Sequence, residues 1–470
     1  MRLLWIALPT TSTVLLMAVT NQMCSDVGVV PLLWVLPLGL YLLSFILCFE
    51  SDRIYWRPVF WLLLAGAAGV IVKLLIENVY APILWQIVGY NAALFVCCMV
   101  CHGELARLKP HPRRLTAYYL AISAGGAAGG VLVAVAAPLV FPAYFELHIG
   151  LWACVALAIV AFGREEWTAA RWRRRWFFPM LATGSVAALT ILGWTLEDEA
   201  REELESSVSA SRNFYGALQV QEYNADDPEY HHYALQHGRI LHGTQFVASW
   251  RRKLPFTYYS EKSGAGLAIL NRRPGMPIRL GVVGLGVGTL AAYAAPGDVV
   301  RFYEINPEVL RIAHENFSYL DDCMGKCEVA LGDARLSLER EPSQQFDVLV
   351  LDAFTGDAIP VHLLTAEAMK TYRRHLKPDG VLAVHTSNRF VTLEPVVKGL
   401  AAHYGMATAV ISHGEDTVEF SPSVWVLVTA DGEFLETPEI RGAMRAPEDE
   451  PTIAPRLWTD DYSDLLSILQ

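Results

Sequence analysis

Three glycines and three acids in the second half of the chain have the types and spacing of a nucleotide-binding site. Each group directly follows or ends an apolar run, and the residues are Gly284, Gly286, Gly288, Glu304, Asp333 and Asp352. A glycine turn lets the backbone approach a ligand closely, and carboxylates accept hydrogen bonds from hydroxyl and amino groups. The pattern therefore predicts a pocket for a ligand that carries a sugar and a base.

The glycine spacing indicates which ligand this is. The dinucleotide fingerprint has its third glycine at the position that Thr289 occupies here, so the spacing disfavours NAD and FAD. It suits a pocket of the S-adenosylmethionine (AdoMet) type, in which Gly284, Gly286 and Gly288 lie against the amino-acid or aminopropyl end of the ligand. The alternative is a glycine turn that serves packing alone.

The acids complete the expected adenosine site. Glu304, at the end of the second apolar run, is placed to accept hydrogen bonds from a ribose diol, and Asp333 to meet the adenine amino group. Each acid alone could be a solvated loop carboxylate. Their order at the ends of successive strands favours binding, because ligands bind at that edge of an open α/β sheet.

A further acid follows the fourth apolar run and has the position of a catalytic group. Asp352 could take a proton from an attacking amine or orient an ammonium group by its charge. Its alternative is a helix cap or a turn residue. Asp357, in a GDAIP turn, is a weaker substrate-binding candidate.

Alternating strand and helix patterns must position these residues. Apolar runs at 278–286, 299–305, 327–333, 346–354 and 380–386 predict strands, and the segments between them, beginning with 287–295, predict helices. Such alternation predicts right-handed crossovers and a mostly parallel sheet. The run 423–430 is expected to finish the sheet.

The sequence divides into four predicted regions. We expect a transmembrane domain at 1–196, a small β-domain at 206–275, a Rossmann-like domain at 276–435 and a C-terminal tail at 436–470. The β-domain prediction rests on short strand patterns with glycine-containing turns at 214–223, 232–243 and 256–261.

The first half reads as membrane helices. The chain has 470 residues, of which 53% are hydrophobic and 18% charged, which is too apolar for an ordinary soluble protein. Seven stretches are long and apolar enough to span a bilayer. They lie near 3–21, 29–49, 57–77, 80–101, 116–141, 145–163 and 177–195.

Loop charge predicts how these spans are oriented. The loops after the second, fourth and sixth spans carry arginine and lysine, and the loops after the first, third and fifth have almost none. The positive loops should face the cytoplasm of a bacterial inner membrane. Seven spans would then place the C-terminal domain outside, whereas a cytosolic AdoMet-type ligand requires it inside. The span at 177–195 decides between the two.

Net charge and cysteines limit the remaining possibilities. A net charge of −11 argues against a nucleic-acid partner. Of the eight cysteines, Cys323 and Cys327 alone lie in the polar half, where they could form a disulfide or remain as two thiols. A metal site would need more ligands than the sequence offers nearby.

At this point the chain resembles a known family, the spermidine synthases, which are polyamine aminopropyltransferases. The segment from Gly284 to Gly380 looks like their catalytic domain in YEINPEVL, GDAR, LDAFTGDAIPVHLLT and LKPDGVL. HGTQ (242–245) and FTYYSE (256–261) resemble the segments that close the active site. The whole chain resembles bacterial proteins in which membrane spans are fused to such a domain.

The resemblance implies a role for each residue. Asp352 would be the general base, Glu304 the ribose anchor and Asp333 the adenine contact, while Gln245 and Tyr258 would line the ligand and amine sites. Three departures remove charge from the pattern. Val287 and Thr355 stand where the family has acids, and Tyr258-Tyr259-Ser260 replaces Tyr-His-Glu.

The sequence leaves three functions open. One is a membrane-anchored aminopropyltransferase that uses decarboxylated S-adenosylmethionine and a small-molecule amine as co-substrates, with no prosthetic group. The second is an S-adenosylmethionine-dependent methyltransferase on the same fold. The third is a non-catalytic ligand-binding domain of a membrane protein. The expected partners are the amine and the lipid bilayer, and a homo-oligomer is compatible with the sequence.

Overall fold

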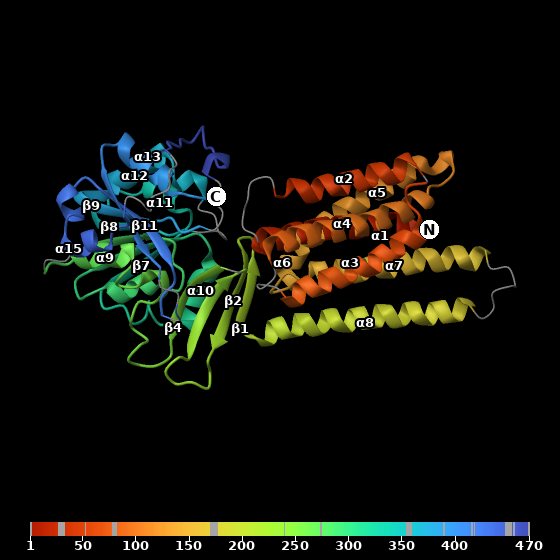
Figure 1. Ribbon diagram of the computed structural model, residues 1–470, viewed down its shortest axis with the longest axis horizontal. Helices are drawn as coiled ribbons and strands as arrows, with labels where there is room; N and C mark the ends of the chain where they lie inside the picture. The colour runs from red at the N-terminus through yellow and green to blue at the C-terminus, as the bar shows by residue number, and fades with distance from the viewer. Residues whose placement is uncertain are drawn as a thin grey trace. The chain divides into compact units, whose positions relative to one another are not determined.

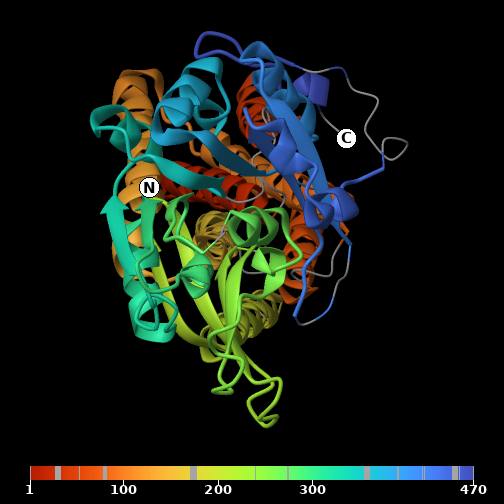
Figure 2. The ribbon, with the colours of Figure 1, turned by 90° about the vertical axis from the view of Figure 1, so that its left-hand side faces the viewer.

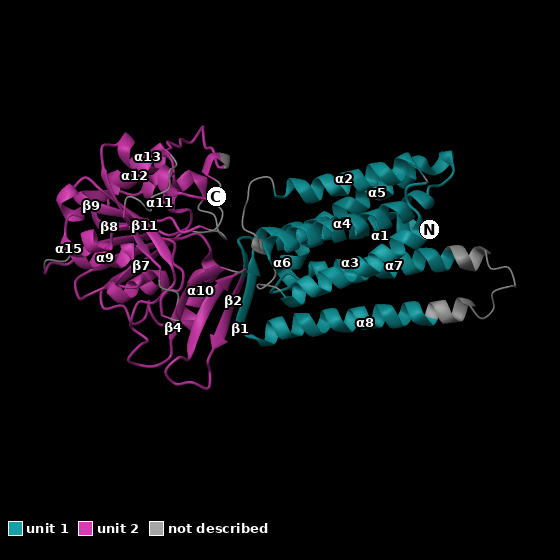
Figure 3. Cartoon of the chain, in the orientation of Figure 1, with its two compact units in different colours: residues 1–217 teal, residues 218–470 magenta. Residues whose placement is uncertain are grey.

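A computed structural model gives the fold of the chain in two compact units. Unit 1 is Met1–Ala217 and unit 2 is Leu218–Gln470, and each is described here by itself (Figure 3). The structure describes residues 2–26, 33–51, 53–77, 82–169, 177–238, 240–272, 275–353, 360–388, 391–414, 417, 419–446, 454 and 456–468. Each unit has its own buried apolar core.

Unit 1 is built from long helices and ends in a strand. α1 contacts α4, α5 and α7 within the unit (Figure 1). The elements are α1 (Arg2–Asp26), α2 (Val35–Glu50), α3 (Arg57–Glu77), α4 (Ile83–Arg107), α5 (Leu115–Val131), α6 (Ala137–Val140), α7 (Glu146–Ala169), α8 (Phe177–Glu205) and β1 (Ser207–Asn213). A π-helical turn, Leu132–Ala136, joins α5 to α6.

Five of these helical segments are long and apolar enough to cross a membrane. They are Arg2–Cys24, Arg57–Glu77, Ile83–Arg107, Pro112–Val140 and Glu146–Arg164. Their large apolar side chains point outward as well as inward, with Leu62 76% exposed and Leu139 83% exposed. A helix that is apolar all round suits a hydrocarbon environment on its outer face.

The other two predicted spans have different outcomes. The stretch at 29–49 contains α2, an apolar helix of 16 residues, shorter than the other five. The stretch at 177–195 forms the first part of α8, which continues for a further ten residues through the acidic segment that ends at Glu205. α8 is therefore one helix with an apolar first part and a charged last part.

Unit 2 is organised around a seven-stranded mixed sheet of order β10-β11-β9-β8-β5-β6-β7. β5 to β9 run parallel to one another, and β11 and β10 are antiparallel additions at one edge. The strands are β5 (Arg279–Val283), β6 (Val299–Glu304), β7 (Lys326–Leu331), β8 (Phe346–Leu351), β9 (Leu376–His385), β10 (Ala407–His413) and β11 (Ser423–Thr429). This is a Rossmann-like arrangement, as the sequence predicts.

Helices cover both faces of this sheet. Alternate residues of β8 belong to two cores, since Val348 and Val350 pack in one and Leu349 and Leu351 in the other. α9 (Gly264–Asn271) and α10 (Pro307–Asn316) supply the first core, and α11 (Ala334–Arg340), α12 (Ala366–His375) and α13 (Glu394–His403) the second (Figure 2). A strand buried on both faces reads as a continuous apolar run, which explains why β5 and β8 were predictable.

Smaller elements complete unit 2. β2 (Gly216–Tyr223), β3 (His232–His237) and β4 (Ile240–Phe246) form an antiparallel series, as the glycine-containing turn patterns predict. Two short helices, α14 (Gly432–Leu435) and α15 (Pro438–Ala443), follow the last strand of the sheet.

Two predicted elements are wrong. The helix expected at 287–295 is only a five-residue 3-10 helix, Thr289–Tyr293, because Gly288 in the left-handed region precedes it and the chain turns back at Gly297, which also has positive φ. The strand expected at 256–261 contains a 3-10 turn, Thr257–Tyr259, which buries the side chains of Thr257, Tyr259 and Ser260 together rather than on alternate faces.

Cys323 and Cys327 form a disulfide just before and at the start of β7, with their Cα atoms 6.5 Å apart. The other six cysteines are free thiols, five of them buried in unit 1. Of the two states that the sequence left open, the structure contains the disulfide. Disulfides persist in oxidising compartments and are rare in the cytosol, so the compartment decides whether the bond forms in the cell.

We predict that full-length protein purified in air and then denatured without reductant exposes six thiols to a maleimide. With reductant, all eight cysteines should react. Cys323→Ser should release the thiol of Cys327 without reductant, whereas the control Cys24→Ser should remove one reactive thiol under both conditions. Eight reactive thiols before reduction would contradict the pairing. Trapping thiols in intact cells would report the compartment of unit 2.

Candidate functional site

The glycine turn and Asp352 meet between β5 and β8, where the order in which the chain adds strands to the sheet reverses. From β5, the chain proceeds to β6 and β7 on one side and later returns to β8 and β9 on the other. In open α/β sheets, ligands bind outside the carboxyl ends of the strands at this switch point. Gly284 directly follows β5 and Asp352 directly follows β8, whose last residues pair as Val283 and Leu351.

The backbones of these two segments approach so closely that Gly284 cannot carry a side chain. A Cβ atom at Gly284 would lie 2.3 Å from the carbonyl oxygen of Asp352, and its φ of +97° lies in the region that favours glycine. A Cβ at Gly286 would lie 2.5 Å from the carbonyl oxygen of His242 in β4. Packing within the protein therefore accounts for these two glycines, whether or not a ligand also lies against them.

Glu304 connects the glycine turn to the start of α10. Its Oε2 accepts a hydrogen bond from the backbone N–H of Leu285 at 2.9 Å, and its Oε1 accepts one from Asn306 at 2.8 Å. The side chain is buried, and burial raises its pKa while these backbone bonds oppose the rise. A third backbone N–H, that of Ile305, also bonds to this carboxylate, which has about four acceptor sites and so keeps capacity for a ribose hydroxyl.

Asp352 lies in a cluster of aromatic and imidazole rings. Its Oδ2 accepts a hydrogen bond from the Tyr259 hydroxyl, and its Oδ1 pairs with Nδ1 of His385 at 2.7 Å. Asp352 and both partners are buried. His385 is not among the residues predicted from the sequence. This histidine ends β9, the last of the parallel strands, at the same edge of the sheet as the predicted acids.

The predicted amine-site residue Tyr258 lies on this cluster. Its ring stacks on the imidazole of His385 with centroids 4.9 Å apart, and its hydroxyl donates to the carbonyl of Leu241 at 3.3 Å. Burial raises the pKa of Tyr258 well above its usual value, so the phenol stays protonated. The structure thus brings Tyr258, Tyr259, Asp352 and His385 together.

Gln245, the predicted ligand-lining residue, bonds to the protein through both ends of its amide. Its Nε2 donates to the carbonyl of Arg252 at 2.9 Å and to the hydroxyl of Ser318 at 3.0 Å, and its Oε1 accepts from the Ser318 backbone at 2.8 Å. In this state Gln245 fixes β4 to the segment after α10.

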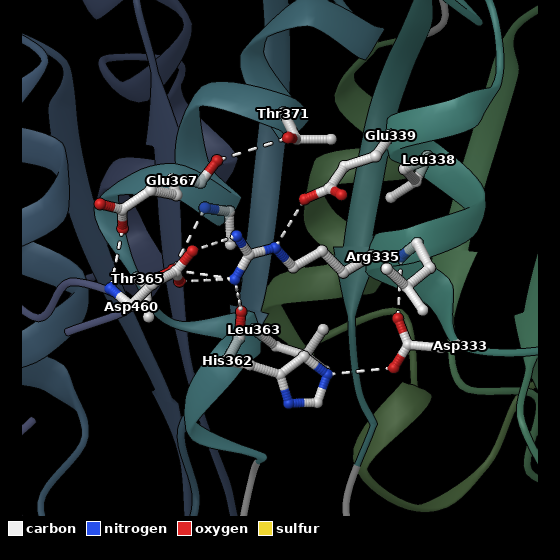
Figure 4. A network of polar contacts seen from close by, with 12 residues as sticks. Asp333, Arg335, Leu338, Glu339, His362, Leu363, Thr365, Glu367, Thr371 and Asp460 are labelled. Carbon is white, nitrogen blue, oxygen red and sulfur yellow. Dashed lines mark hydrogen bonds and ion pairs between the residues drawn. The ribbon is translucent and has the colours of Figure 1, made fainter.

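The predicted adenine contact Asp333 is held at the start of α11. Its Oδ1 caps the helix by accepting from Leu336 N at 2.8 Å, and its Oδ2 contacts Nε2 of His362 at 3.1 Å. Figure 4 shows these contacts beside Arg335, which forms two hydrogen bonds to Asp460. This network joins the segment that follows the carboxyl end of β7 to the segment before α12 and to the C-terminal region.

Three polar atoms near the glycine turn are buried without a hydrogen-bond partner among the described residues. They are His242 Nε2, Thr244 Oγ1 and Thr289 Oγ1. Burial lowers the pKa of His242 to about 4, so its ring is neutral. Buried polar atoms normally have partners, so these three fit a polar ligand at this place.

The sequence also singles out Asp357, Thr355 and Gly288. Asp357 and Thr355 fall at 354–359, outside the described residues. Gly288 is in the left-handed region but faces Leu320 rather than another strand end. No group of three or more His, Cys, Asp or Glu side chains that could hold a metal ion occurs in the described part of the chain.

Comparison with known proteins shows a similarity over part of the chain. No protein-family model matches it. The polyamine aminopropyltransferase of Vibrio vulnificus is 34% identical over 115 residues, which cover 23% of this chain and 38% of that protein. The N-terminal histidine N-methyltransferase of Emericella nidulans is 34% identical over 105 residues, or 22% of this chain and 19% of that protein. The chain therefore spans less than half the length of these relatives.

Solved structures give a weaker likeness. The spermidine synthase of Thermotoga maritima is 13% identical with a TM-score of 0.36, covering 55% of this chain and 82% of that one. A probable spermidine synthase from Corynebacterium glutamicum is 18% identical with a TM-score of 0.40, covering 49% and 82%. The sequence comparison shows that this chain is similar to a polyamine aminopropyltransferase over 23% of its length.

Proposed function

We propose that unit 2 binds an adenosyl sulfonium and transfers its aminopropyl group to an amine. The observation that carries this proposal is the meeting of the glycine turn, Glu304 and Asp352 at the switch point of the sheet. The similarity to an aminopropyltransferase supports it independently. The co-substrate is decarboxylated S-adenosylmethionine, and no prosthetic group takes part.

Each strand end has a task in this proposal. Glu304 receives a ribose hydroxyl on its remaining acceptor capacity, while its backbone bonds keep the glycine turn in place. Asp333 receives the adenine amino group, and His242, Thr244 and Thr289 supply polar atoms that lack partners in the described structure. Tyr258 and Asp357 belong to the amine side.

The transfer reaction needs few catalytic groups from the protein. A sulfonium is a good leaving group, so the site must hold the amine in line with the reacting carbon and remove its proton. The rings around Asp352 exclude water from this region, because Tyr259, His385 and Trp425 are almost completely buried.

A methyltransferase on the same fold is the second candidate, and Val287 favours it. This residue is fully buried between the second and third glycines, where it packs against Gly243, and it offers no acid to an aminopropyl ammonium. S-adenosylmethionine carries a carboxylate on that end and needs no acid there. Calorimetric titration with both sulfonium compounds and methylthioadenosine separates the two: tighter binding of the decarboxylated donor favours aminopropyl transfer, and tighter binding of S-adenosylmethionine favours methyl transfer.

The outward apolar side chains of the helices in unit 1 support a membrane anchor. The side of the membrane matters for turnover. Loop charge and the Cys323–Cys327 disulfide favour the outside for unit 2, whereas the cytosolic origin of the donor requires the inside. The aminopropyltransferase proposal therefore requires that the apolar part of α8 does not cross the bilayer.

We predict that Glu304→Gln weakens binding of methylthioadenosine to the full-length protein by roughly 10- to 150-fold. The amide presents one acceptor where the carboxylate presents two, and a hydrogen bond to a charged group contributes about 1.5–3 kcal/mol. Calorimetry in detergent measures the effect. Glu308→Gln, an acid on α10 that pairs with Arg311, is the matched control and should bind normally. Equal affinity in both variants would remove Glu304 from the site.

The affinity of the wild-type protein should also depend on pH through Glu304. The ionised carboxylate accepts from the ribose, and burial raises its pKa, so binding is complete above that pKa and is lost as pH falls through it. We expect the midpoint above about 4.3, the ordinary glutamate value. Calorimetry between about pH 8 and pH 4 should show the decline in the wild type but not in Glu304→Gln. A midpoint at or below the ordinary value would contradict this environment.

The side of the C-terminus can be measured with fusions at residue 470. The aminopropyltransferase proposal predicts a fluorescent C-terminal green fluorescent protein and an inactive C-terminal alkaline phosphatase, because both reporters would then lie in the cytoplasm. The opposite pair would agree with the loop charge and the disulfide. It would leave unit 2 as a ligand-binding domain without a cytosolic donor, the third function that the sequence allows.

A further inference from the structure

Both oxygens of Asp352 already hold hydrogen-bond donors. The Tyr259 hydroxyl, from the 3-10 turn after β4, donates to Oδ2, and His385 at the end of β9 pairs with Oδ1 at 2.7 Å. An ionised carboxylate can only accept, so both partners must donate to it. His385 therefore carries its proton on Nδ1.

The position of that proton fixes the rest of the chain of hydrogen bonds. In a neutral imidazole with a protonated Nδ1, Nε2 is an acceptor. Its partner is the hydroxyl of Ser387 at 2.8 Å, which must then donate to it. The same hydroxyl oxygen accepts from the backbone N–H of Val424 at 2.7 Å. Every hydrogen has one consistent place, from Val424 through Ser387 and His385 to Asp352.

Two aromatic rings hold the imidazole from its faces. The ring of Tyr258 stacks on the imidazole with centroids 4.9 Å apart, and the ring of Trp425 stacks on it with centroids 4.5 Å apart, each at an interplanar angle of 17°. The ring of His385 cannot rotate between them, so its two nitrogens keep their directions.

We propose that His385 Nε2, rather than Asp352, takes the proton from the acceptor substrate, and that Asp352 is a positioning residue that acts through His385. This inference rests on the proposed transferase function. Both oxygens of Asp352 already accept a hydrogen bond from a protein group, whereas Nε2 of His385 meets a serine hydroxyl that an acceptor N–H can replace. An imidazole held by a carboxylate at Nδ1, with a hydroxyl at Nε2 that a substrate N–H can replace, has the arrangement of a general base.

The step balances in atoms and charge. The lone pair of the acceptor nitrogen forms a bond to the carbon next to the sulfonium, and the carbon–sulfur bond breaks with its electron pair going to sulfur. The sulfonium becomes a neutral thioether. The proton of the acceptor nitrogen passes to Nε2 of His385, and Asp352 stabilises the resulting imidazolium until the proton leaves to water.

Ser387 serves in this proposal as the hydrogen-bond partner of His385 Nε2 and not as a nucleophile. Its oxygen is fixed by the Val424 backbone between β9 and β11, and it occupies Nε2 while no acceptor is bound. An acceptor N–H that reaches the imidazole replaces the serine hydroxyl as the donor to Nε2. The serine thus keeps the buried nitrogen satisfied in the free protein.

The first test does not depend on turnover. Nitrogen-15 NMR of histidine-labelled full-length protein at pH 8 reports which nitrogen of each ring is protonated, and the signals lost in His385→Gln identify His385. We expect a neutral ring with hydrogen on Nδ1, unchanged in Ser387→Ala because Asp352 sets the tautomer. Hydrogen on Nε2 or on both nitrogens would overturn the proposal, since Nε2 could not then accept a proton.

The second test separates this inference from the proposed function. Release of methylthioadenosine from decarboxylated S-adenosylmethionine with a diamine acceptor should fall about 100-fold or more in His385→Gln, the effect of losing a general base. The affinity for methylthioadenosine should stay within about threefold, as in the control His314→Gln on the exposed face of α10. Retained turnover in His385→Gln would overturn the inference alone. If methylthioadenosine does not bind the wild type, the proposed function itself fails.

Discussion

The site depends on the contact between the backbone of Gly284 and the carbonyl of Asp352. β5 and β8 are adjacent parallel strands, and Asp352 N bonds to the carbonyl of Val283 at 2.9 Å, so the two chains leave the sheet side by side. A Cβ at Gly284 would lie 2.3 Å from the Asp352 carbonyl oxygen. Any other residue would force the strand ends apart, and with them the glycine turn and the acid.

The described acids at this edge also hold the protein itself in place. Glu304 holds the glycine turn through Leu285, Asp333 caps α11, and Asp352 orients His385. The ligand would therefore meet carboxylates whose directions are already set, which reduces the ordering that binding must provide. The site also carries little free charge, since Val287 and Ser260, which stand where the resembling family has acids, are buried neutral groups.

Short-range sequence patterns predict most of the fold but only part of the candidate site. β5 and β8 were predictable because strands buried on both faces are continuously apolar, and β6, β7 and β9 because shorter apolar runs alternate with helix patterns. The positions of Glu304 and Asp352 were predictable because these acids end or follow such runs. The prediction of a helix at 287–295 was wrong, because three glycines with positive φ and the turn at Gly297 leave room for only five helical residues. His385 was missed because its partner lies 33 residues away in sequence, and only the parallel register of β8 and β9 brings the two together.

The central claim is that an adenosyl ligand lies at the carboxyl ends of β5, β6 and β8. Photolabelling of the full-length protein with 8-azido-S-adenosylmethionine, followed by mass spectrometry of its peptides, tests it most directly. We expect label within residues 284–306 or at the start of α11, and loss of this label when methylthioadenosine competes. Label confined to the helices of unit 1, or label that competition does not remove, would contradict the account.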